Sequence, residues 1–157
     1  MDYDLIVVGG GSGGLACAQR AAEHGARAMV IESHRLGGTC VNVGCVPKKV
    51  MWHAAQLAHA AHDARDYGFD LTLRHHDWTQ LKTRRDAYIA RLNGIYAANL
   101  EKRGVTLLRE RAQLTATQSV AAGGREYRAP HIVIATGGHP EVPVIPGAEL
   151  EIGRAHV

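Results

Sequence analysis

Hydrophobic residues in the first 32 positions alternate between continuous runs and helical spacing. The apolar run at 4–9 ends in glycine, the spacing over 12–25 is that of a helix, and the run at 28–32 reads as a second strand. Two strands joined by one helix form a β-α-β unit, whose strands run parallel and whose crossover is almost always right-handed. The pattern therefore predicts the start of an α/β fold with a parallel sheet.

The middle of the chain is predicted to form two long helices. Residues 47–64 are rich in alanine and begin with Pro47, which is favourable in a first helical turn. Residues 67–73 interrupt the pattern. Helical spacing returns over 77–103, and Gly104 suits a C-cap. We expect this second segment to be a long surface helix.

The last third of the chain has the pattern of strands. The predicted strands cover residues 105–108, 112–117, 126–128 and 131–135. A hairpin turn at Gly123 and Gly124 makes the central part a small antiparallel β meander, and the apolar run at 131–135 is typical of a buried strand.

The composition fits one globular domain and argues against nucleic-acid and membrane partners. The 157 residues are 46% hydrophobic and 21% charged, which is enough for one core. The formal charge of +3 is scattered, without a basic cluster or a recognition motif, so no nucleic-acid partner is expected. No run approaches the roughly 18 apolar residues that span a bilayer, and the N-terminus has no basic, apolar leader. We therefore expect no membrane partner and a cytoplasmic location.

The end of the chain continues neither a helix nor a strand. We interpret residues 1–150 as the N-terminal part of one domain and residues 151–157 as a non-native tail. The codons ATC GGA AGA GCA CAC GTC would encode residues 152–157 and match a sequencing-library adapter. A native series of genomic codons at these positions would contradict the interpretation.

A glycine-rich loop joins the first strand to the first helix. Residues 9–14 satisfy G-x-G-x-x-G, so backbone N–H groups and the positive helix end can face a pyrophosphate. Taken without further evidence, the motif has an alternative interpretation, in which the glycines serve only the tight packing of the first strand against the first helix. Glu32 follows about 20 residues later, where a carboxylate accepts hydrogen bonds from ribose hydroxyls. Together they favour a Rossmann-like dinucleotide-binding domain, without separating FAD from NAD.

Two cysteines five positions apart, Cys40 and Cys45, follow the second strand. In a regular helix their Cα atoms would lie roughly 8 to 9 Å apart, beyond the roughly 7 Å limit for a disulfide. The segment must bend if the thiols pair, and Gly44 offers the freedom for it. Two buried free cysteines are the alternative. A zinc site is disfavoured because no Cys-x-x-Cys or matched His pair lies nearby, and Cys17 is expected in the core.

Residues 37–52 (GGTCVNVGCVPKKVMW) resemble the active-site segment of the class I pyridine nucleotide-disulfide oxidoreductases. Within that class, Lys48 and residues 85–100 (RDAYIARLNGIYAANL) are most similar to the glutathione reductases, and the resemblance covers residues 4–150. It implies an NADPH:glutathione-disulfide oxidoreductase of cell redox homeostasis. The implied cofactors are bound FAD and NADPH, and the implied partners are glutathione disulfide and a second subunit of a homodimer.

The resemblance also implies roles for individual residues. Cys40 is similar to the interchange thiol that attacks glutathione disulfide, Cys45 to the thiol beside the flavin, and Lys48 to a lysine near the flavin. Tyr96 is similar to a tyrosine that covers the glutathione site, although its pattern alone favours core packing. No metal ligand is implied. The residues implied to bind FAD are Gly9, Gly11, Ser12, Gly13, Gly14, Glu32, Gly38, Thr39, Cys40, Lys48, Ala112, Thr136 and Gly137.

Two alternatives stay open at this point. One is a trypanothione or thioredoxin reductase-like enzyme, and the other is a non-catalytic nucleotide-binding module whose cysteines sense redox state. The resemblance further implies that the NADPH and interface domains lie outside this chain, which would be inactive alone. Most features that separate the alternatives are expected in those missing domains.

Overall fold

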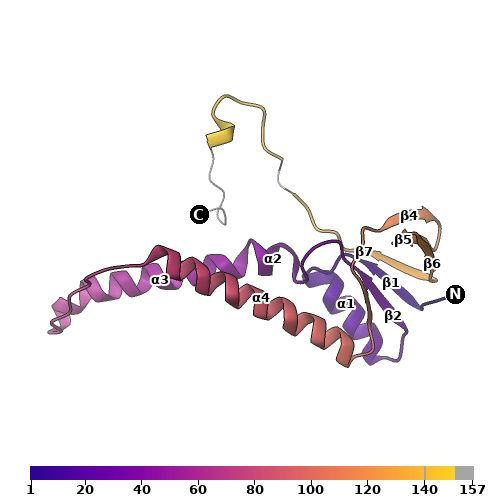
Figure 1. The fold of residues 1–157 in the computed structure, drawn as a ribbon, viewed down its shortest axis with the longest axis horizontal. Coiled ribbons are helices and arrows are strands. Elements are labelled where there is room, and N and C mark those ends of the chain that lie inside the picture. The colour runs from indigo at the N-terminus through magenta and orange to yellow at the C-terminus, as the bar shows by residue number, and fades with distance from the viewer. Residues whose placement is uncertain (140, 151–157) are drawn as a thin grey trace.

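The computed structural model describes residues 1–139 and 141–150. The part of the chain around its two sheets forms three layers (Figure 1). The middle layer is a four-stranded parallel sheet in the order β3-β2-β1-β7, and a separate antiparallel sheet has the order β4-β5-β6. The predicted α/β, Rossmann-like class with a parallel sheet and a β meander is confirmed. The interpretation of residues 151–157 as a non-native tail concerns positions outside the described residues.

The strands are short and their pairing is regular. β1 pairs with β2 from Leu5 opposite Ala28, and with β7 from Leu5 opposite His131. The strands of the parallel sheet are β1 (Leu5–Val8), β2 (Ala28–Ile31), β3 (Thr106–Leu108) and β7 (His131–Ile134). The meander consists of β4 (Gln113–Ala116), β5 (Ser119–Ala122) and β6 (Arg125–Arg128).

The central strand β1 contributes to two hydrophobic cores. Leu5 and Val7 pack on the helix side of the sheet, in a cluster with Leu15. Ile6 points to the other face, where it packs with Val120 of the meander. Because successive side chains of a strand point to opposite faces, a strand covered on both sides must be apolar throughout.

The three predicted helices are confirmed with small shifts at their ends. The helices are α1 (Ser12–Glu23), α2 (Gly38–Asn42), α3 (Cys45–Asp63), η1 (Ala64–Tyr67), α4 (Trp78–Lys102) and η2 (Ala148–Leu150). α3 begins two residues before Pro47, which the first turn tolerates because its N–H groups have no intrahelical partners. α3 and α4 form a hairpin that projects from the sheet (Figure 1). Among the described residues, no helix combines the length and apolarity needed to cross a membrane.

Four short elements were not predicted, namely α2, β5 and the 3-10 helices η1 and η2. The sequence pattern required a bend between the cysteines but did not indicate the five-residue helix α2. The sequence pattern also did not indicate β5, because two of its four residues are alanine, which is depleted in strands. The turn that precedes β5 places Gln118 at φ 66, and glutamine does not signal such a turn.

The start of α4 carries a side-chain cap. Oδ1 of Asp77 accepts a hydrogen bond from the backbone N–H of Gln80 at 2.8 Å. We expect Asp77→Ala to lower the free energy of unfolding by about 1 kcal/mol, whereas Asp77→Asn retains a capping oxygen and nearly all of the stability. Chemical denaturation measures both variants. An alanine variant as stable as the wild type would contradict the contribution of the cap.

Candidate functional site

A cavity of about 780 Å³ lies beyond the carboxyl ends of β1, β2 and β7. In open α/β sheets, ligands bind in the crevice at this edge. The cavity wall combines the glycine loop, the end of β2, helix α2 and the segment after β7. The lining residues are Gly11, Ser12, Gly13, Glu32, His34, Arg35, Gly38, Thr39, Cys40, Asn42, Val43, Ala135, Thr136, Gly137, Gly138 and His139.

The glycines of the loop have two different physical functions. A Cβ on Gly14 would lie 1.9 Å from the carbonyl oxygen of Gly9, so this position tolerates only glycine. Gly9 itself has φ +109, and a Cβ there would lie 2.3 Å from the oxygen of Ala135. A Cβ on Gly13, by contrast, would meet no atom within 4 Å. Gly9 and Gly14 therefore close the turn, while Gly13 leaves open space at the cavity wall.

The N-terminus of α1 at the cavity wall is suited to an anion. Gly11 is the N-cap residue and supplies no side-chain cap, and the first turn contains no acidic residue. The N–H groups of a first helical turn have no intrahelical acceptors, and the helix dipole is positive at this end. A pyrophosphate group therefore fits the donors that this loop presents.

Glu32 is held at the cavity wall by two backbone groups. Its Oε2 accepts a hydrogen bond from the N–H of Gly10 and its Oε1 accepts one from the N–H of His34, each at 2.7 Å. Each carboxylate oxygen keeps further acceptor capacity. The side chain is thus oriented in advance for the hydroxyls of a ribose, and the donor and acceptor set of the cavity fits a dinucleotide.

An adjoining cavity of about 440 Å³ extends this site past the end of β1. Its lining includes Gly9, Glu32, Ala112, Thr136 and Gly137. Glu32 borders both cavities. The structure therefore brings Ala112, which is distant in sequence, to the same edge of the sheet as the glycine loop.

The cysteine segment is bent as the sequence predicted. Cys40 lies in α2, half-buried at the cavity wall, and Cys45 is the exposed first residue of α3. A Cβ on Gly44 would lie 2.9 Å from the oxygen of Thr39 and 3.3 Å from the Cα of Cys40. Gly44 has φ −120, so glycine is required here for the close approach of the backbone rather than for a left-handed conformation. All three cysteines are free thiols.

The two thiols of the bend influence each other's ionisation. The hydrogen bond with Cys45 raises the pKa of Cys40, and burial raises it further. The same hydrogen bond lowers the pKa of Cys45, and the positive charges of Lys48 and Lys49 contribute to this lowering. When the reduced pair loses its first proton, the negative charge therefore falls on Cys45 and Cys40 keeps its proton.

This asymmetry predicts the order of alkylation. With rising pH, iodoacetamide should modify Cys45 before Cys40, because only the thiolate reacts and the pKa of Cys45 is the lowered one. In Cys45→Ser, the pKa of Cys40 should fall towards its ordinary value, because its thiolate partner is lost. Peptide mass spectrometry after timed alkylation measures both rates. Faster modification of Cys40 throughout the titration would contradict the assignment.

Four of the predicted site residues line neither of these two cavities. Gly14 is buried beneath the glycine loop. Cys45 and Lys48 are exposed at the start of α3. Tyr96 is half-buried on α4 and packs against the helix-side core. The roles that the resemblance assigns to these residues stay predictions.

Several residues at the site were missed by the sequence analysis. His34 and His139 line the cavity, and so does Asn42 of α2. The two histidines follow the ends of β2 and β7, and residues that follow parallel strands gather at one sheet edge. Their positions shortly after two parallel strands could therefore have identified both histidines from the sequence. Asn93 of α4 reaches Asn42 from a distant part of the chain and left no local signal.

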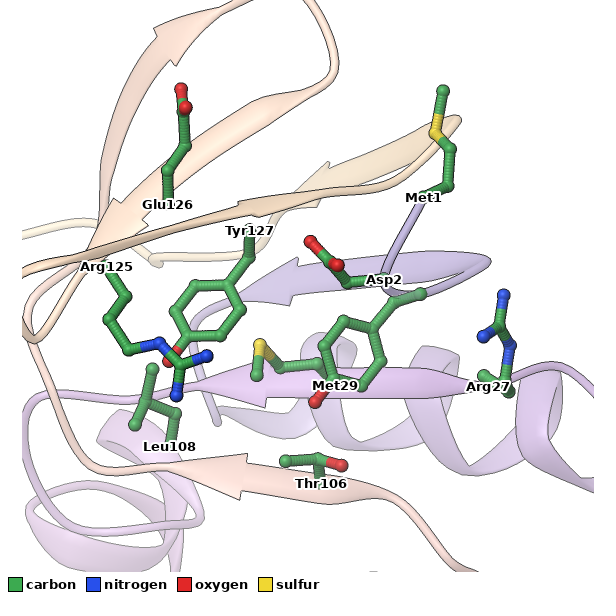
Figure 2. A pocket seen from close by; sticks show the side chains of 10 residues that line it. Met1, Asp2, Arg27, Met29, Thr106, Leu108, Arg125, Glu126 and Tyr127 are labelled. Carbon is green, nitrogen blue, oxygen red and sulfur yellow. The ribbon is translucent and has the colours of Figure 1, made fainter.

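A separate pocket of about 580 Å³ lies between the N-terminal residues, β2, β3 and β6 (Figure 2). The rings of Tyr3 and Tyr127 lie 6.4 Å apart, and the guanidinium of Arg125 lies 5.7 Å from the Tyr127 ring. Arg27 pairs with Asp4. Because its arginines already have partners and no cysteine lines it, the candidate site is the cavity beside Cys40.

Comparisons with known proteins match almost the whole chain. The family described as "Pyridine nucleotide-disulphide oxidoreductase" matches residues 3–156. The glutathione reductase of Yarrowia lipolytica (strain CLIB 122 / E 150) is 49% identical over 164 residues, covering 96% of this chain and 35% of the relative. That of Schizosaccharomyces pombe (strain 972 / ATCC 24843) is 50% identical over 159 residues, covering 96% and 34%. The chain thus spans about a third of the length of these curated relatives.

Proposed function

Because the chain belongs to the pyridine nucleotide-disulphide oxidoreductase family, we propose that it forms the FAD-binding part of an NADPH-dependent glutathione-disulfide reductase. One observation carries the proposal. Cys40 of the thiol pair lines the same cavity as the glycine loop and Glu32, so a bound dinucleotide and a redox-active disulfide would meet there. The two glutathione reductases of similar sequence support glutathione disulfide as the substrate.

The residues of this chain would hold the cofactor in distinct ways. The N–H groups at the start of α1 would bind the pyrophosphate, and Glu32 would accept hydrogen bonds from the ribose. When bound, FAD supplies electron transfer from NADPH to the cysteine pair. Thr39 and Cys40 border the cavity on the side of the thiols, and the exposed Lys48 would place a positive charge near the flavin.

The thiol chemistry follows from the ionisation of the pair. The Cys40–Cys45 disulfide would accept two electrons and one proton, which leaves a thiol at Cys40 and a thiolate at Cys45. The sulfur of Cys40, after losing its proton, attacks glutathione disulfide and forms a mixed disulfide. The S–S bond of the substrate breaks, and the first glutathione leaves as a thiolate that takes up one proton. The Cys45 thiolate then attacks the Cys40 sulfur, which releases the second glutathione and restores the internal disulfide. Electrons balance at two for each substrate disulfide.

Substrate preference tests the proposal. We would express the full-length protein that contains this chain and follow NADPH oxidation with glutathione disulfide, trypanothione disulfide and oxidised thioredoxin. We expect kcat/KM for glutathione disulfide to exceed the others by at least about tenfold, a difference of 1.4 kcal/mol in transition-state binding. A preference for another disulfide would identify a different reductase, and no turnover with any of them would identify a non-catalytic module.

We further propose that the full-length protein is a homodimer in the cytoplasm. The helical hairpin α3–α4 exposes apolar side chains, among them Trp52 at 53% and Leu57 at 72% exposure, which suits a protein partner. Three cysteines in 157 residues are too few for the disulfide framework of a secreted domain, which favours a reducing compartment. Light scattering of the purified protein and fractionation of cells that express a tagged copy would test the two statements separately.

A further inference from the structure

Two asparagine side chains anchor the helix that carries Cys40. Nδ2 of Asn42 donates to the oxygens of Gly38 at 2.9 Å and Leu36 at 3.1 Å. Nδ2 of Asn93, which lies 57 residues from Leu36, donates to the same Leu36 oxygen at 2.8 Å and to Oδ1 of Asn42 at 3.1 Å. Only the amide nitrogen can donate, so these acceptors fix the orientation of both side chains.

The helix α2 is short and buries little of its own side-chain surface. It has five residues, no side-chain cap at its start, and one buried residue, Val41. Its N-terminal side is tied to the glycine loop, where the N–H of Gly37 donates to the oxygen of Gly10 at 2.8 Å. Its other side is tied to α4 through the amide of Asn93. α4 is a firm support, since its Leu100 and Ile89 are buried in the structure.

Displacement of α2 would change the geometry of the thiol pair. Asn42 lies two residues after Cys40 and three before Cys45. The bend between them is already tight, because the Gly44 backbone closely approaches Thr39 and Cys40. A loss of the amide anchor would therefore act directly on the relative position of the two sulfur atoms.

We propose that Asn93 is a positioning residue that, through Leu36 and Asn42, holds α2 so that Cys40 and Cys45 form their disulfide readily. The inference rests on the proposed redox function of the pair. A less ordered segment lowers the effective concentration of one thiol towards the other. The internal disulfide then becomes less stable relative to glutathione disulfide.

The test measures the equilibrium between the cysteine pair and glutathione buffers. The full-length protein is equilibrated at graded ratios of reduced and oxidised glutathione, quenched by alkylation and analysed by mass spectrometry. We expect Asn93→Ala and the isosteric Asn93→Asp to lower the equilibrium constant for disulfide formation by about tenfold, which corresponds to about 30 mV for this two-electron couple. The matched control Asn99→Ala, on the same helix, should stay within about twofold of the wild type.

The outcomes separate this inference from the proposed function. If wild-type cysteines do not exchange with glutathione, the proposed function fails. If they exchange and a folded Asn93 variant has the wild-type equilibrium constant, only the positioning role is overturned. Should both Asn93 variants fail to fold, Asn42→Ala decides, because it breaks the same network. If Asn42→Ala leaves the equilibrium constant for disulfide formation unchanged, the inference is overturned. A fall of about tenfold in this constant supports the inference.

Discussion

Cys40→Ser is expected to reduce the turnover of glutathione disulfide by at least about a thousandfold, as the loss of a catalytic nucleophile does in other enzymes. Serine nearly preserves the size of the side chain at the cavity wall, so FAD content should remain at the wild-type level. Cys17→Ser is the matched control. Cys17 lies on α1 against the helix-side core and should retain activity. Steady-state NADPH oxidation measures all three proteins, and substantial turnover in Cys40→Ser would contradict the assigned exchange step.

The second large effect is expected at the glycine loop. In Gly14→Ala, the new Cβ would lie 1.9 Å from the oxygen of Gly9, and the strand-to-helix turn would have to open. We expect the free energy of unfolding to fall by about 3 kcal/mol or more, beyond ordinary overpacking. The measurement is chemical denaturation of the purified protein.

Two other alanine variants serve as controls for Gly14→Ala. Gly94 lies within α4, and a Cβ there would meet nothing within 4 Å, so Gly94→Ala should gain roughly 0.5 to 1 kcal/mol. Gly13→Ala should fold normally and lose FAD affinity, because the added methyl group occupies open space at the cavity wall. Equal stability of Gly14→Ala and the wild type would show that the turn does not require this glycine.

The glycine loop and the cysteine helix also touch each other. A Cβ on Gly38, the first residue of α2, would lie 2.8 Å from the Cα of Gly11. The N–H of Gly37 bonds to the oxygen of Gly10. The segment that would bind the pyrophosphate and the segment that carries Cys40 are therefore packed together, and a change in one is transmitted to the other.

The elements that were predicted well from the sequence are those with a strong pattern of hydrophobic residues. β1, α1 and β2 follow from apolar runs and one helical spacing, and α4 agrees with its predicted span to one residue at each end. The helix α2 could not be predicted, because five residues provide little more than one turn of periodicity. β5 is weak in local propensity and forms through its pairing with β4 and β6.

The candidate site shows the same division between local and distant information. The glycine loop and the bend between Cys40 and Cys45 are encoded within a few residues, so the sequence alone indicated them. Asn93 and His139 join the site through tertiary packing. Their contributions depend on where α4 and β7 lie, which no short motif encodes.

The most direct test of the account is the visible spectrum of the full-length protein during anaerobic reduction with NADPH. If the Cys45 thiolate lies against the bound flavin, a long-wavelength charge-transfer absorbance should appear in the wild type and be absent in Cys45→Ser, and addition of glutathione disulfide should remove it. A bound flavin that is reduced without this band, or a band that persists in Cys45→Ser, would contradict the account.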